Sequence, residues 1–303
     1  MKKAVTKKPA SRMEKQEAAA GLLFILPTYF FYFVFMVIPL IMTVYYSFTE
    51  YNMVRPPEWV ALANYVKLFG DKVVLTTLKN TAFFTVFCMI LKIVFGFLLA
   101  VLFSGSAMYR AVRSIGRGVL FFPYVVGLSY MALTFGYLFS TDTGAVNWFL
   151  VNVLHLSKIP WFTKSNYAMA MLIAIDVWKH LGFSMLLFLA GMQNISQDYY
   201  EAASLDGASA WQKTAYITFP LLMPIVVMNI ILFTINGLQM FDLPSILTNG
   251  GPGNGTRSLV MYIYARAFTK YEMGYASAIS IVFLLIMGVI SSIQLKLDQE
   301  NDQ

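Results

Sequence analysis

Six long, almost uncharged apolar stretches divide this sequence, and they constrain its fold more than any other feature. They cover about residues 21–48, 81–103, 118–139, 167–190, 219–241 and 276–295. Each is close to the roughly 20 residues that an α-helix needs to cross a bilayer. The stretches are continuously apolar rather than alternating, which favours helices over the strands of a β-barrel. The sequence therefore predicts an all-α membrane protein with six transmembrane helices.

The composition agrees with lipid as the solvent. Of the 303 residues, 58% are hydrophobic and only 12% are charged, whereas soluble domains carry about a quarter charged residues. A single cysteine, Cys88, excludes a disulfide within the chain, and His155 and His180 are too far apart in sequence to suggest a metal site. The sequence also lacks a nucleophile–base constellation. We expect no catalytic residues and no metal, so this chain is predicted not to be an enzyme.

The basic residues predict the orientation in the membrane. The net charge is +7, and the Lys and Arg residues do not form one groove, so nucleic acid is not an expected partner. Residues 1–20 form a basic tail beside the first stretch, and a short loop carries Arg110, Arg113 and Arg117. Lys and Arg concentrate on the cytoplasmic side of short flanks. We expect both termini in the cytoplasm, with a transmembrane domain at 21–295 and a short C-terminal tail at 296–303.

The segment between the fourth and fifth stretches, residues 196–220, is unusual for a connecting loop because it mixes acids, small residues and aromatic residues. Asp198 and Glu201 would lie near the positive N-terminal end of a first short helix. Gly207 can adopt the left-handed conformation that ends this helix, and the sequence from Ser209 fits a capping box that opens a second one. We expect two short helices around a hinge, presenting a docking surface.

Six residues of this loop fit a longer pattern, which comprises Glu201, Ala202, Ala203, Gly207, Ile217 and Pro220. At these spacings the segment resembles the signature cytoplasmic loop of ABC importer permeases, with Phe219 where leucine is usual. The resemblance implies the type I ABC importer permease fold and a coupling loop that inserts into a cleft of a separate ATP-binding subunit. Glu201 would face a basic group there, Gly207 would set the bend, and Asp206 and Trp211 would share the surface.

The same loop nearly matches a phosphate-binding motif between Gly207 and Thr214. Gln212 replaces the second glycine of that motif, however, and no strand precedes it. We therefore reject nucleotide binding and expect no cofactor in this chain. ATP and Mg²⁺ would be bound by the partner ATPase.

Further residues point to one branch of these importers. The run from Phe241 to Gly253 and the later Tyr262 and Tyr275 resemble the carbohydrate-uptake branch, in particular the maltose-transporter F-type and glycerol-phosphate A-type membrane subunits. The glycines at 250–253 by themselves indicate a tight turn. The resemblance implies a bacterial or archaeal plasma membrane, a second permease subunit of the G type, two ATP-binding subunits and an extracytoplasmic substrate-binding protein.

Polar residues inside the stretches are candidates for the substrate path. Asp176, Lys179 and His180 share one helical face, because their spacing is i, i+3 and i+4. They could line a wet cavity, or Asp176 and Lys179 could neutralise each other and hold this helix against a neighbour near Lys92. The second interpretation is favoured because charges within membranes usually pair.

The fifth stretch carries three amides, Asn229, Asn236 and Gln239, within a narrow arc of the helix. Amides offer both donors and acceptors to sugar hydroxyls. They equally suit hydrogen bonds between helices, and the sequence does not decide between the two roles.

The sequence thus predicts the transmembrane subunit of an ATP-driven sugar or oligosaccharide importer. An importer of glycerol phosphate, a polyol or another small solute is an alternative. A secondary transporter is disfavoured, because Asp176 is the only clear acid within the stretches and the docking loop would have no purpose.

Overall fold

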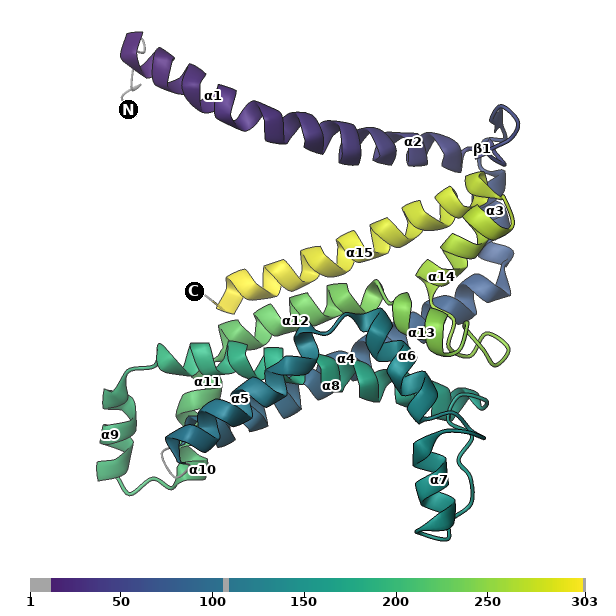
Figure 1. Ribbon diagram of the computed structural model, residues 1–303. Helices are drawn as coiled ribbons and strands as arrows, with labels where there is room; N and C mark the ends of the chain where they lie inside the picture. The colour runs from purple at the N-terminus through teal and green to yellow at the C-terminus, as the bar shows by residue number, and fades with distance from the viewer. Residues whose placement is uncertain (1–11, 106–108, 302–303) are drawn as a thin grey trace.

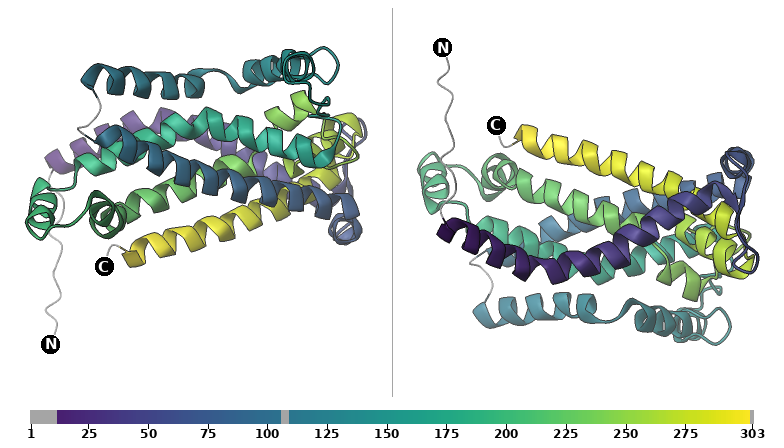
Figure 2. Two further views of the ribbon diagram at one scale, coloured as in Figure 1. Left: turned by 90° about the horizontal axis from the view of Figure 1, so that it is seen from below. Right: turned by 90° about the horizontal axis from the view of Figure 1, so that it is seen from above.

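Long helices that run back and forth between two ends of the molecule make up the fold (Figures 1 and 2). The computed structural model describes residues 12–105 and 109–301. A helix satisfies its backbone hydrogen bonds internally, which suits segments whose apolar side chains face lipid. The all-α membrane fold expected from the sequence is confirmed.

The elements follow in chain order, with η marking π-helices. They are α1 (Arg12–Tyr32), η1 (Phe33–Val37), α2 (Ile38–Ser47), β1 (Thr49–Glu50), β2 (Glu58–Trp59), α3 (Ala63–Gly70), α4 (Lys72–Ser104), α5 (Arg110–Val125), α6 (Leu128–Leu138) and α7 (Ala145–Asn152). After these come α8 (Ser165–Gln193), α9 (Gln197–Leu205), α10 (Ala210–Lys213), η2 (Thr214–Thr218), α11 (Phe219–Leu221), α12 (Met223–Leu238), α13 (Asp242–Leu247), α14 (Leu259–Tyr264), η3 (Ala265–Thr269) and α15 (Met273–Asn301).

Five helical segments in the described part of the chain are long and apolar enough to cross a membrane. They are Leu23–Ser47, Lys72–Ser104, Ser165–Gln193, Met223–Leu247 and Met273–Lys296. The pair α5 and α6 passes the same test together. Counted with this pair, the six predicted spans are confirmed in number. The second begins earlier than predicted, because Asp71 caps α4 by accepting a hydrogen bond from the amide of Val73.

The sequence predicts one continuous helix over residues 118–139, and this prediction is wrong. α5 and α6 meet at an angle of 97°. Pro123 lies in the last turn of α5, where its ring removes a backbone donor, and Val126 and Gly127 are extended. The third span is therefore an elbow rather than a straight helix.

Small residues let the central helices approach closely. A side chain at Gly96 in α4 would meet Ser184 of α8, and one at Gly182 in α8 would meet the backbone of Leu120 and Phe121 in α5. Helices in membranes associate by such close packing, since lipid gives little hydrophobic drive between them. α8 accordingly lies at the centre of the bundle between α4 and α5.

The helices α1, η1 and α2 form an arm that diverges from the bundle at its N-terminal end (Figure 1). The most apolar part of Leu23–Ser47 has no buried residue in this chain. The arm joins the rest where α2 packs against the start of α15 and at β1. β1 pairs antiparallel with β2, so that Thr49 lies opposite Trp59. There Asn64 Nδ2 donates to the carbonyl oxygens of Ser47 and Thr49 at 3.0 and 2.9 Å.

The predicted tails differ from the helix limits. Of the expected basic tail at residues 1–20, residues 1–11 lie outside the described part, and residues 12–20 already belong to α1. Similarly, α15 continues to Asn301, and residues 302–303 of the expected C-terminal tail lie outside the described part.

Candidate functional site

Residues 196–220, here called the docking loop, project from one end of the bundle (Figures 1 and 2). Its first helix, α9, is capped by Ser196, whose Oγ accepts a hydrogen bond from the amide of Asp198 at 3.3 Å. Asp198 lies in the first turn, where a negative charge complements the helix dipole. Tyr200 OH and Thr218 Oγ1 lie 3.0 Å apart, which ties α9 back to the return segment η2.

The hinge of the loop has the geometry that the sequence predicts. Gly207 adopts a φ of +76°. The amide of Gly207 donates to Ser204 O, and the amide of Ala208 donates to Ala203 O at 2.9 Å. These two bonds form a Schellman motif, which satisfies carbonyls at the end of α9 and requires a left-handed residue at Gly207. The predicted helix–hinge–helix structure is confirmed.

The second helix, α10, opens with the expected capping box. Gln212 N donates to Ser209 Oγ at 3.3 Å, and Ser209 N donates to Gln212 Oε1 at 2.8 Å. Lys213 Nζ reaches back across the hinge and donates to Ser204 Oγ at 2.7 Å. Local hydrogen bonds thus fix the hook shape of the loop without support from the bundle.

The docking loop turns its large side chains to the outside. Leu205 is 90% exposed and Trp211 is 74% exposed. The carboxylates of Glu201 and Asp206 are also exposed, and no ion pair within the described chain involves them. Of the other predicted coupling residues, Ala202 is exposed and Ala203 is half-buried under the hinge. Exposed aromatic and aliphatic groups beside unpaired acids form a surface suited to a protein partner.

The buried charges in the bundle do not form the predicted pair between Asp176 and Lys179. Lys92 Nζ of α4 lies 2.5 Å from Asp176 Oδ2 of α8, and His180 Nδ1 lies 3.2 Å from Asp176 Oδ1. Asp176 therefore pairs with Lys92, as the sequence suggested for a neighbouring helix. The expected neutralisation of Asp176 by Lys179 is wrong, because the lysine side chain turns towards a different helix.

Lys179 stabilises the elbow of the third span. Its ammonium donates to the carbonyl oxygens of Tyr124 at 2.9 Å and Val126 at 2.5 Å, and more weakly to Pro123 at 3.4 Å. The carbonyls of Tyr124 and Val126 lose their helical partners where α5 ends, whereas Pro123 O still accepts from the amide of Val126 at 3.3 Å. The lysine thus replaces the missing amide donors with a charged one. Its predicted contact with substrate stays a prediction.

The three amides of the fifth span have different environments. Asn229 is fully buried, donates to Ile225 O at 2.8 Å and accepts from Ser184 Oγ at 3.3 Å. It therefore joins α12 to α8 here. Asn236 on α12 and Gln239, which directly follows it, are exposed, and their contact with substrate stays a prediction.

The predicted turn at Gly250–Gly253 lies at the end of the bundle opposite the docking loop (Figure 1). Gly250 and Gly253 have φ values of +79° and +63°, which fit the tight reversal expected from the sequence. Asn80 Nδ2 of α4 holds the loop by donating to the carbonyl oxygens of Asn254 and Arg257 at 2.6 and 3.1 Å. The loop is consequently fixed to the bundle.

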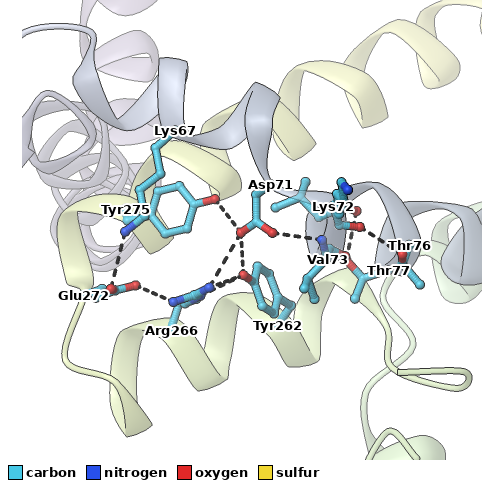
Figure 3. A network of polar contacts seen from close by, with 11 residues as sticks. Lys67, Asp71, Lys72, Val73, Thr76, Thr77, Tyr262, Arg266, Glu272 and Tyr275 are labelled. Atoms are coloured by element: carbon cyan, nitrogen blue, oxygen red, sulfur yellow. Dashed lines mark hydrogen bonds and ion pairs between the residues drawn. The ribbon is translucent and has the colours of Figure 1, made fainter. Parts of the chain in front are cut away.

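A second polar cluster at this end joins segments that are distant in sequence (Figure 3). Asp71 Oδ2 accepts hydrogen bonds from Tyr262 OH at 2.5 Å and Tyr275 OH at 2.8 Å. Arg266 donates to Tyr262 OH through Nε at 2.8 Å and pairs with Glu272 at 2.9 Å. We call these five residues the Asp71 network. It connects the start of α4 with α14, η3 and α15.

The network shifts the ionisation of its members. Burial alone would raise the pKa of Asp71, but hydrogen bonds from Tyr262 and Tyr275 outweigh it and hold this pKa below its usual value. Burial and the hydrogen bond to Asp71 raise the pKa of Tyr262 to about 12. The carboxylate and the neutral phenol are thus the stable forms at neutral pH.

Sequence reasoning missed the joint role of Asp71 and Arg266. No local pattern marks Asp71, because its partners Tyr262 and Tyr275 lie 191 and 204 residues away along the chain. Arg266 contacts its near neighbours Tyr262 and Glu272, and it meets Asp71 only through the tertiary fold. Within the described residues, no group of three or more His, Cys, Asp or Glu side chains is placed to hold a metal ion.

Comparisons with known proteins agree with this architecture. Residues 92–302 match the family model described as "Binding-protein-dependent transport system inner membrane component". The arabinooligosaccharides transport system permease protein AraP of Bacillus subtilis is 34% identical over 283 residues, covering 92% of this chain and 88% of AraP. The trehalose/maltose transport system permease protein MalF of Thermococcus litoralis is 32% identical over 283 residues, covering 92% and 93%.

A solved structure shows the same fold. It is the bacterial alginate ABC transporter in complex with an alginate pentasaccharide-bound periplasmic protein, and one of its chains superposes with a TM-score of 0.82 at 21% identity. The match covers 94% of this chain and 96% of that chain. The bent hook between two central spans, the six-span bundle and these matches lead to one conclusion: the chain belongs to the family of binding-protein-dependent transport system inner membrane components, the permease subunits of ABC transporters.

Proposed function

We propose that this chain is one of two membrane subunits of an ATP-driven importer for sugars or oligosaccharides, and that the docking loop couples it to a separate ATPase. The observation that carries the proposal is the loop itself. Its shape is fixed by its own caps and by Gly207, while Leu205, Trp211 and Glu201 face outward without partners in the described chain. A rigid, exposed hook can transmit a push to the helices at both of its ends.

The connections of the loop suggest how the motion is transmitted. α9 follows directly after α8, the central helix, and α10 leads through η2 and α11 into α12. Displacing the hook would therefore move α8 and α12 together against the remaining helices. Closure of a pair of partner ATPase subunits around ATP would switch the bundle between inward-facing and outward-facing states, and no covalent chemistry would occur in this chain.

Orientation and partners follow from the same arrangement. The start of α1, the end of α15 and the docking loop share one end of the bundle, which we assign to the cytoplasm of a bacterial or archaeal cell (Figure 2). The opposite end, with the fixed turn at Gly250–Gly253, would meet an extracytoplasmic binding protein. The unburied apolar arm is a surface on which the second permease subunit could pack in place of lipid.

The substrate class rests on the relatives. AraP is named for arabinooligosaccharides and MalF for trehalose and maltose, and both match nearly the whole chain. Exposed Asn236 and Gln239 supply donors and acceptors that suit sugar hydroxyls. A sugar panel that includes glycerol phosphate and a polyol, tested by thermal shift on the associated binding protein, separates the carbohydrate proposal from its alternatives.

The coupling role is tested with two matched glycine variants. Gly207→Pro and Gly253→Pro each place proline where φ is positive, so both carry a similar local backbone cost. We expect Gly207→Pro to abolish ATP-dependent uptake into vesicles and to reduce co-purification of the ATPase. Gly253→Pro should retain the ATPase. Normal ATP-dependent uptake by Gly207→Pro would contradict the coupling role, and uptake by the purified chain alone would favour a secondary transporter.

A further inference from the structure

A pocket of about 590 Å³ opens between the end of α4, the start of α5 and the end of α8. It lies at the same end of the bundle as the docking loop, because α8 leads into α9 directly beyond it. Its lining includes Arg110, Arg113, Arg117, Ser114 and the apolar Leu189 and Met192. We call it the arginine pocket.

The charge of the arginine pocket has one sign. Arg110, Arg113 and Arg117 lie at i, i+3 and i+7, so they share one face of α5. None of the residues that line the pocket is acidic, and none of these arginines forms an ion pair in the described chain. Three guanidinium groups around one pocket repel each other unless an anion lies between them.

Some of the N–H donors of these arginines already form hydrogen bonds within the protein. Arg117 Nη2 donates to Phe103 O at 2.6 Å, and Arg113 Nη1 donates to Ser104 O and Gly105 O at 3.4 and 3.3 Å. These bonds cap the carbonyl end of α4. Arg117 Nε is buried without a partner, and the side chain of Arg110 makes no hydrogen bond with the described residues. Because each guanidinium has five N–H donors, most donors remain for a ligand.

The local helix geometry adds to this charge. α5 begins without a side-chain cap at Tyr109 and has no acid in its first turn. Its first backbone amides therefore lack side-chain acceptors among the described residues, and the positive end of the helix dipole adds to the arginine charge. Basic residues are unfavourable at this position unless an anion is bound, and helix N-termini bind phosphate groups well.

A position at the cytoplasmic surface of the membrane would explain why this part of α5 is basic. It would not explain why the three arginine side chains share one face and line the pocket. The exposed apolar residues of the same helix segment, Val112, Ile115 and Val119, lie on the opposite face of α5 from the arginines. The guanidinium groups thus turn away from the apolar face and converge on the pocket. Such convergence indicates a site for one compact oxyanion rather than a diffuse basic surface.

We propose that the arginine pocket binds a phosphate group, carried either by the headgroup of an anionic phospholipid or by a free phosphate ion. Arg110 and Arg113 would supply the direct hydrogen bonds, and Ser114 is near enough in sequence to add a hydroxyl donor from the same helix. A phosphate in this position would neutralise the start of α5 and join it to the ends of α4 and α8, beside the docking loop.

The test compares two double variants with the same change in net charge. Arg110→Gln with Arg113→Gln removes the proposed contacts, while Lys79→Gln with Lys270→Gln removes two exposed cations at other positions. The full-length chain, with the subunits that co-purify with it, is placed in nanodiscs of phosphatidylcholine containing a fraction of phosphatidylglycerol. Native mass spectrometry then measures which lipid each protein retains.

For a lipid ligand, we expect the unmodified protein and the lysine variant to retain phosphatidylglycerol over phosphatidylcholine. The arginine variant should bind phosphatidylglycerol about thirtyfold more weakly, the effect of two basic residues at a membrane surface. For a free ligand, the comparison uses pure phosphatidylcholine nanodiscs with inorganic phosphate or with chloride at equal ionic strength. Phosphate should raise the unfolding temperature of the unmodified protein and of the lysine variant, but not that of the arginine variant.

Two results would overturn the proposal. One is that neither phosphatidylglycerol nor inorganic phosphate is preferred by the unmodified protein. The other is that both double variants behave alike. If the arginine double variant elutes as an aggregate, Arg110→Gln alone is measured, since it removes no hydrogen bond to the described protein. These binding readouts need neither ATP nor transport, so they fail or succeed independently of the proposed uptake function.

Discussion

Lys92 of α4 and Asp176 of α8 form an ion pair of 2.5 Å in the middle of the bundle, with both side chains almost completely buried. Removing two charges from water is costly unless they satisfy each other. His180 adds a contact at 3.2 Å to the other carboxylate oxygen. The pair therefore holds α4 against α8, the two helices at the centre of the fold.

Asp176→Asn should destabilise the protein strongly, because it leaves the ammonium of Lys92 buried without a counter-charge. We expect a loss of about 3–5 kcal/mol in the free energy of unfolding, measured by denaturant titration in micelles. Asp142→Asn is the control, since the Asp142–Lys158 pair is exposed and should cost at most about 1 kcal/mol. Replacing Lys92 and Asp176 together with methionine should recover most of the loss. Equal losses in Asp176→Asn and Asp142→Asn would refute the role of the buried pair.

Lys179→Met should loosen the elbow between α5 and α6. The substitution retains the apolar stem but removes the donor to Tyr124 O and Val126 O. A hydrogen bond from a charged group contributes about 1.5–3 kcal/mol, so amides around the elbow should exchange hydrogen at least tenfold faster. Hydrogen exchange with mass spectrometry measures this. Lys164→Met, at an exposed position, is the control, and identical exchange in both variants would show that the lysine does not support the elbow.

Gly182→Ala should separate α8 from α5. The added methyl group would meet the backbone of Leu120 and Phe121, which cannot turn aside as a flexible side chain can. Overpacking of this kind costs about 1–3 kcal/mol. Gly288→Ala in α15 has open space around it and should be neutral or slightly stabilising, because alanine favours helix. Thermal unfolding of both variants provides the comparison, and equal midpoints would argue against close packing at Gly182.

Acid should weaken the end of the bundle that contains the Asp71 network. The folded pKa of Asp71 lies below the value of about 3.9 expected in the unfolded chain. Its contribution is therefore complete above pH 4 to 5 and is lost as the pH falls through the folded pKa. Between pH 6 and pH 3, the unfolding temperature of Asp71→Asn should fall less steeply than that of the unmodified protein. At pH 6 the variant should already be less stable than the unmodified protein.

Tyr262→Phe provides an intermediate case for the same measurement. It removes one of the two phenol donors to Asp71 and leaves Tyr275 in place. Its acid dependence should lie between those of the unmodified protein and Asp71→Asn. If the unfolding temperature of Tyr262→Phe falls with pH as steeply as that of the unmodified protein, Tyr262 does not lower the pKa of Asp71.

The docking loop could be predicted in detail because its structure is local. Ser196, Ser209 and Gln212 form caps with residues at most three positions away, and Gly207 ends α9 through bonds to the preceding turn. Such interactions depend on short sequence spacings. The candidate substrate residues were less predictable, since the burial of Asn229 and the exposure of Asn236 depend on which side of α12 faces α8.

By itself, the sequence determined the membrane class, the six spans and the bent hook, because apolar length and helix caps act within a single element. Only the tertiary structure decided that Asp176 pairs with Lys92 rather than Lys179, that the third span bends, and that Asp71 meets Tyr262. Helical spacing places two residues on the same face, but it does not specify which neighbouring helix each side chain reaches. In a low-dielectric bundle, a buried charge pairs where helix packing brings a partner within contact distance.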